Sequence, residues 1–210
     1  MFLTQIIPNL EVSDVVRWTL TPNGFYSNSF AWNALRPSRS IVPWYRLVWF
    51  GKCVPRWSFI LWLAIRGRLS TMDRVIIFLP LAALDCVFCH AAAETHNPLF
   101  FDCAYSFGIW THVLSKCDVS RPLLPWSDFI SWAATNWKGN GLPVAILKLA
   151  LQAVVYAIWC GRNNRRFRNE SLPPVVVFKG IVESICLCVL SWKIPHTPNT
   201  YNFHEWRLAY

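Results

Sequence analysis

The stretch 86–103 combines three cysteines with two histidines, residue types that bind metal ions. Cys86 and Cys89 are separated by two residues, a spacing that lets one tight turn present two thiolates to a single ion at about 2.3 Å. Cys103 and His96 follow within short reach, which makes the cluster a candidate Cys3His structural zinc site. Buried free cysteines also pack as small apolar side chains, so plain core packing is the other interpretation.

Catalytic motifs do not accompany this cluster. The sequence contains no phosphate-cradling G-x-x-x-x-G-K-S/T motif and no Y-x-D-D polymerase motif. Cys89 and His90 are adjacent in sequence, so their side chains are poorly placed to face each other, and no third group is evident to orient them. We therefore expect no enzymatic activity and no small-molecule substrate.

A second candidate site is the arginine-rich stretch 162–168. The whole chain has 20 basic and 11 acidic residues, a net charge of +9 and a pI near 9.4, which suits a polyanionic partner. Trp159 and Phe167 interleave with the arginines, and this mixture suits phosphate contact combined with base stacking. A solvated helix end, where arginines meet the helix dipole, is the alternative. The candidate nucleic-acid-binding residues are Arg162, Arg165, Arg166 and Arg168.

Helical periodicity dominates the elements that must position these residues. Apolar residues spaced three and four apart predict helices over 55–66, 104–114, 126–137, 142–168 and 175–190, with shorter ones near 29–35, 41–54 and 70–79. The sequence Thr21-Pro22-Asn23-Gly24 lies between two β-prone segments and predicts a β-hairpin over 15–26. The expected fold is mainly α, with a small N-terminal β-hairpin and a Cys-rich knuckle in an irregular helical assembly.

The clearest linker is Lys138-Gly139-Asn140-Gly141. It predicts two domains, 1–138 with a core at about 27–115, and a helical C-terminal extension over 142–210 that carries the basic run. The apolar segment 142–160 has the length of a membrane span, but Lys148 and Gln152 interrupt it. We therefore expect a buried helix there and no membrane partner.

The N-terminal segment lacks the basic, apolar and small-residue regions of a secretory signal. With eight cysteines in the chain, this indicates reduced thiols and an intracellular protein, nuclear or cytoplasmic and not secreted.

Three groups of residues in this sequence match one family pattern. The first is Cys86-x2-Cys89, Glu94-Thr95, Leu99-Phe100-Phe101-x-Cys103 and Trp110; the second is Pro55-Arg56-x-Ser58-Phe59-Ile60-Leu61-Trp62 with Gly67-Arg68-Leu69-Ser70-Thr71-x-Asp73-Arg74; the third is Tyr156-Ala157-Ile158-Trp159 with Arg162-Asn163. Together they resemble the zinc-binding domain of plant non-LTR retrotransposon (LINE) reverse transcriptases, over about residues 15–170.

One position departs from the family pattern. The family histidine falls where this chain has Pro98, and proline cannot bind a metal. His96, two residues earlier, or His90 could replace it, although two residues of extended chain displace a side chain by about 6–7 Å. With His96 as the replacement, the zinc ligands are Cys86, Cys89, His96 and Cys103. A three-cysteine site completed by water or another donor, and the absence of any metal, stay open.

The resemblance implies a non-catalytic zinc-binding module that contacts RNA or single-stranded DNA within its parent polyprotein. The alternative is a degenerate remnant, or a helical protein-interaction domain with no retained metal. Thirteen tryptophans and 14 phenylalanines are compatible with that alternative, because aromatic surfaces left exposed would bind other proteins.

Overall fold

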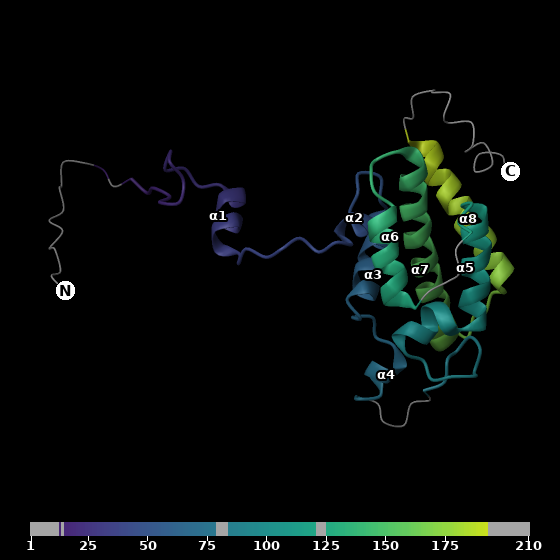
Figure 1. The fold of residues 1–210 in the computed structure, drawn as a ribbon. Coiled ribbons are helices and arrows are strands. Elements are labelled where there is room, and N and C mark those ends of the chain that lie inside the picture. Colours follow the sequence, from purple (N-terminus) through teal and green to yellow (C-terminus); the bar gives the residue numbers. More distant parts are fainter. Residues whose placement is uncertain (1–12, 14, 79–83, 121–124, 193–210) are drawn as a thin grey trace. The chain divides into compact units, whose positions relative to one another are not determined.

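The computed structural model describes residues 13, 15–78, 84–120 and 125–192, and the chain divides into two compact units after Ile41. The first unit contains a turn and the helix α1 (Asn28–Leu35). The second unit contains the candidate metal ligands and the other helices of the described residues (Figure 1).

The predicted N-terminal β-hairpin is wrong. The Trp18 N–H donates to the Gly24 carbonyl at 2.8 Å, and Gly24 has the φ of +71° that the turn requires, but neither flank of this turn forms a strand in the described part of the chain. Val16 and Phe25, on the two flanks, are exposed. A two-stranded hairpin with no surface to pack against is marginal in water, so the turn chemistry alone did not produce a sheet.

The second unit is organised around α7 (Leu142–Arg168), a helix of 27 residues. It packs against α3 (Pro55–Ile65), α5 (Ala104–Lys116) and α8 (Pro174–Ser191), as Figure 1 shows. Pro143 lies in its first turn, where a missing N–H costs nothing. It ends at Asn169, which adopts the left-handed conformation that terminates many helices.

Shorter elements close the core around α7. They are α2 (Tyr45–Val48), α4 (Met72–Val75), a π-helical turn η1 (Pro98–Asp102) and α6 (Trp126–Asn136). Phe101 of η1 stacks on Trp110 of α5 with centroids 5.2 Å apart, and Phe129 of α6 packs on both rings. Many of the aromatic residues therefore form a core that joins η1 to α5 and α6.

The apolar helix α7 contains a buried polar residue, Gln152, whose contacts explain its presence there. Its amide nitrogen donates to the carbonyls of Leu47 and Val48 at 3.0 and 2.8 Å, and its oxygen accepts from Ser58 Oγ at 3.3 Å. The carbonyls at a helix end have no partners within the helix, and buried ones need a donor. Gln152 supplies that donor for α2.

By length and composition, α7 and α8 could each cross a membrane, which is weak evidence because core helices of soluble proteins pass the same test. In α7, 61% of the apolar window is buried within the fold, whereas in α8 the share is 28%. Val175, Val176, Leu187 and Leu190 of α8 are exposed.

The division of the chain into domains 1–138 and 142–210 stays a prediction. In space, the helices on either side of that linker belong to one compact unit, since α7 packs on α3 and α5.

Candidate metal centre

Cys86 and Cys89 lie on a tight turn. The His90 N–H donates to the Cys86 carbonyl at 2.9 Å, and the Cys86 N–H donates to the Ala92 carbonyl at 2.8 Å. His90 has a φ of +52°, in the left-handed region that few residues other than glycine adopt and in which histidine, like asparagine and aspartate, is enriched. An isolated antiparallel bridge between Asp85 and Ala93 closes the base of the turn. The turn is the knuckle that the C-x2-C spacing predicts.

Cys103 reaches the knuckle from the opposite side. It directly follows η1 and is the N-cap residue of α5. Ser106 Oγ donates to the Leu99 carbonyl at 2.6 Å, which links the first turn of α5 to η1. The position of Cys103 is therefore fixed by two helical elements that both belong to the core.

The three sulfur atoms converge. The Sγ atoms of Cys86, Cys89 and Cys103 all lie within 4.8 Å of one another, and Cys86 Sγ is 3.8 Å from Cys103 Sγ. Tetrahedral zinc with Zn–S bonds of about 2.3 Å requires sulfurs roughly 3.8 Å apart. The cysteines are unpaired by disulfides, so the donor set and its spacing fit zinc.

The surroundings of the thiols favour charge on Cys103. The Cys86 thiol donates a hydrogen bond to Cys103 Sγ, and this bond lowers the pKa of Cys103 to about 7, with the backbone amides of Ser106 and Tyr105 adding to the effect. The same bond, together with burial, raises the pKa of Cys86. A thiolate at the start of a helix is favoured by the helix dipole, and the thiolate is the form that binds a metal.

His96 lies outside the group of three sulfurs. Its ring packs against Phe100 and Trp126, with centroids 5.1 and 5.3 Å away, and burial lowers its pKa. His90 is exposed. The structure thus brings together three of the four predicted ligands, and His96 as the fourth stays a prediction that requires its ring to leave these aromatic contacts.

Glu94 is the functional residue whose role the sequence did not reveal. Its side chain is fully buried, and Oε1 accepts from Arg162 Nε at 2.9 Å and Nη2 at 2.6 Å, as well as from the Met72 N–H at 3.1 Å. Arg166 lies 3.5 Å from Oε2. Glu94 follows the bridge at the base of the knuckle, so these contacts fasten the cysteine loop to α7 and α4.

The arginines proposed for nucleic-acid contact occupy different environments. Arg162 is buried on Glu94. Arg165 lies over the rings of Phe88 and Tyr105 at 4.8 and 4.4 Å and donates to the Val87 and Leu172 carbonyls. Arg166, besides its contact with Glu94, donates to the Asp85 carbonyl at 3.3 Å, whereas Arg168 is exposed. Three of the four arginines therefore hold the cysteine loop in place.

This combination defines a class: a cysteine knuckle that closes on a helix N-terminus, supported by a helical body. Residues 26–110 match the model of the family described as zinc-binding in reverse transcriptase, which confirms the resemblance seen in the sequence. The matched domain is a zinc-binding domain and not the catalytic domain of a reverse transcriptase. No curated protein and no solved structure matches the chain.

Proposed function

We propose that the chain is a non-catalytic zinc-binding module from a plant non-LTR retrotransposon polyprotein of the LINE type. The observation that carries this proposal is the convergence of three cysteine sulfurs at zinc-compatible spacing. Cys86, Cys89 and Cys103 would hold the ion, which supplies a cross-link between the knuckle and α5 and no reactivity of its own. Thiols that serve as ligands must stay reduced, in keeping with a nuclear or cytoplasmic protein.

Metal content of protein purified without chelator tests this function. We expect about one zinc per chain, and loss of the zinc on dialysis against a strong chelator should lower the thermal midpoint, because metal-binding free energy adds to folding free energy. A metal-free preparation that neither gains zinc on titration nor changes its midpoint contradicts the proposal.

We further propose that the module binds RNA or single-stranded DNA. The net charge of +9 supports this, since association with a polyanion releases counterions. Anisotropy of the full chain with labelled oligonucleotides should show affinity that falls steeply between about 50 and 200 mM salt. Lack of any salt-sensitive binding at about 50 mM salt rules the proposal out.

A helical protein-interaction domain is the second candidate, favoured by the exposed apolar face of α8. Contiguous apolar surface on a soluble protein often marks an interaction site. Under this alternative the chain would self-associate or precipitate when pure, and Leu187→Ser with Leu190→Ser would restore a monomer. Zinc would then be dispensable for the behaviour in solution.

A further inference from the structure

The arginines of α7 leave little free charge for a polyanion, because Arg162, Arg165 and Arg166 are bound to the cysteine loop. If the module binds nucleic acid, as proposed above, the phosphates must meet other cations. The location of those cations can be deduced from the distribution of charge along the chain.

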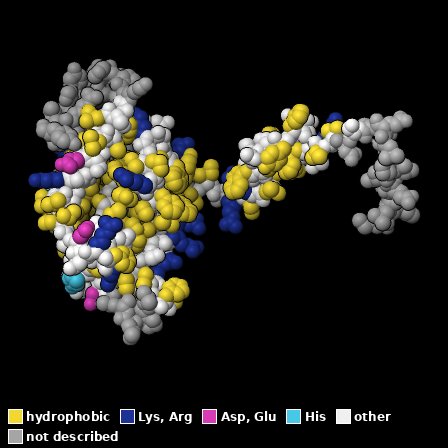
Figure 2. Space-filling view, turned by 180° about the vertical axis from the view of Figure 1, so that it is seen from behind, with side chains coloured by type: hydrophobic (Ala, Val, Ile, Leu, Met, Phe, Trp, Pro, Cys, Tyr) yellow, Lys and Arg dark blue, Asp and Glu magenta, His cyan; other side chains and the backbone are white. Residues whose placement is uncertain are grey.

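No acidic residue occurs between Asp14 and Asp73, although the same stretch contains eight lysines and arginines. Five of these belong to the second unit and are exposed. None of the five takes part in the ion pairs within 4 Å found for the part of the chain that the structure describes. Few acidic side chains are visible among the basic and apolar ones in Figure 2. The five are Arg46, Lys52, Arg56, Arg66 and Arg68.

Arg56, in the first turn of α3, and Arg66, its C-cap residue, lie on the same side of the helix as an aromatic side chain. Arg56, Phe59 and Arg66 are spaced three and seven residues apart, which places them on the same side of the helix. Phe59 is 50% exposed and stacks on Trp62, with centroids 5.8 Å apart. A flat ring between two cations suits a strand whose phosphates meet the arginines while a base stacks on the ring.

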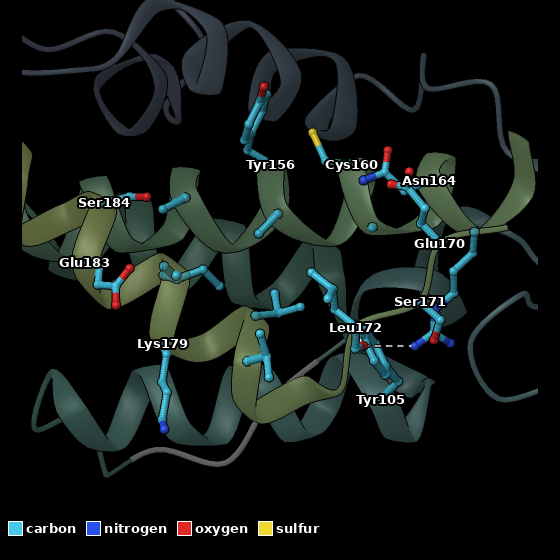
Figure 3. A pocket seen from close by; sticks show the side chains of 18 of the residues that line it. Tyr105, Tyr156, Cys160, Asn164, Glu170, Ser171, Leu172, Lys179, Glu183 and Ser184 are labelled. Carbon is cyan, nitrogen blue, oxygen red and sulfur yellow. Dashed lines mark hydrogen bonds between the residues drawn. The ribbon is translucent and has the colours of Figure 1, made fainter. Parts of the chain in front are cut away.

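A groove of about 910 Å³ adjoins this face, between α3, α7 and α8. Arg56 lines it from α3 and lies 5.6 Å from the ring of Tyr156. Tyr156, Cys160 and Asn164 project from the same side of α7, as Figure 3 shows. The groove therefore combines an aromatic face with an amide that both donates and accepts hydrogen bonds, the groups that hold an unstacked base.

We propose that a single-stranded nucleic acid binds along the outward face of α3, with phosphates on Arg56 and Arg66, one base on Phe59 and another in the groove beside Tyr156. An acidic protein would also satisfy the charges. The exposed ring between the arginines favours a polynucleotide, because every base has a face that stacks.

Variants of the full chain test the site by anisotropy, with a uridine 20-mer and a thymidine 20-mer as probes. Arg56→Gln combined with Arg66→Gln should make the slope of log affinity against log salt shallower by about 1.4, since each single-strand phosphate contact contributes about 0.7. Phe59→Ser should weaken binding roughly 5- to 100-fold and leave the slope unchanged, because stacking releases no counterions. Lys138→Gln, which removes one exposed charge from the segment between α6 and α7, is the matched control and should change neither quantity.

A second measurement reports on the groove directly. Alkylation of Cys160, followed by peptide mass spectrometry, should slow at least several-fold when the oligonucleotide is bound, whereas Cys188, outside the groove lining, should react at an unchanged rate. Unprotected Cys160 in a saturated complex overturns the part of the proposal that concerns the groove.

The outcomes separate this site from the proposed function. If the wild-type chain binds but the α3 variants match it, or if Lys138→Gln has the larger effect, the site lies elsewhere while nucleic-acid binding stands. If heparin competes fully and Phe59→Ser has no effect on affinity, the surface binds polyanions without stacking on bases, and the proposal fails. If the wild-type chain does not bind either probe, nucleic-acid binding and this site both fail.

Discussion

The buried carboxylate of Glu94 accepts two hydrogen bonds from Arg162, 68 positions later in the chain, at 2.9 and 2.6 Å. One partner comes from the cysteine loop and the other from the central helix α7. Because neither charge has access to water, the pair holds the two segments together only while both members are present.

Glu94→Gln should lower the free energy of unfolding by about 3–5 kcal/mol, because it leaves the guanidinium of Arg162 buried without a counter-charge. Chemical denaturation measures the loss. The double variant Glu94→Leu with Arg162→Met should recover much of the stability, since the one charge it leaves without its partner, that of Arg166, is partly exposed to water. A double variant as unstable as Glu94→Gln would mean that the hydrogen bonds, more than the charges, determine the cost.

Cys89→Ser should reduce bound zinc from about one ion per chain to a small fraction, because it removes one of three converging thiolates. The thermal midpoint should fall to that of the chelator-treated wild-type chain, and chelator should then have no further effect. Cys53→Ser is the control, since Cys53 lies outside the group of three sulfurs. Equal zinc content in Cys89→Ser and Cys53→Ser would contradict the assignment of Cys89 as a zinc ligand.

Pro98→His should raise the affinity for zinc, because it restores a donor at the family position in η1 while His96 stays against Phe100 and Trp126. Competition with a coloured chelator measures the affinity, and cobalt substitution reports the ligand set through its absorption bands. If the cobalt absorption spectrum is the same for the wild-type chain and Pro98→His, but changes in His96→Phe, His96 already provides the fourth ligand.

Lys148 is buried in α7, and desolvation lowers its pKa below 10.5. Between the folded and unfolded pKa values the unfolded chain binds more protons, so the stability of the wild-type chain rises with pH in that window. Below the window the buried side chain is destabilising. Lys148→Met should therefore be more stable than the wild-type chain at pH 7, and the difference should narrow as the pH approaches 10.5. If the difference in stability between Lys148→Met and the wild-type chain does not change with pH, titration of Lys148 is excluded as its cause.

Much of the helical framework could be predicted because its signals are local. The apolar periodicity of 55–66, 104–114 and 142–168 matches α3, α5 and α7 closely. The hairpin prediction failed because Asn23-Gly24 specifies a turn, whereas a sheet needs a surface that the exposed flanks lack. Local signals thus indicated the helices but could not supply that surface.

The candidate metal site was likewise predictable only where its signals are local in the sequence. Spacing alone indicated that Cys86, Cys89 and Cys103 converge, since knuckle turns are local. The roles of Arg162, Arg165 and Arg166 depend on partners about 70 to 80 residues away, and no short-range pattern distinguishes an arginine that binds a buried carboxylate from one that meets a phosphate. The directions in which these side chains point came only from the tertiary structure.

The contacts of Gln152 bear on where the chain should be cut for expression. The family match ends at Trp110, but the carbonyls of Leu47 and Val48 receive their donor from α7, more than 40 residues beyond that point. A fragment trimmed to the matched segment would leave these acceptors unsatisfied and remove the guanidinium that Glu94 requires. The smallest piece suited to biophysical work therefore extends through Arg168, well past the border that sequence similarity suggests.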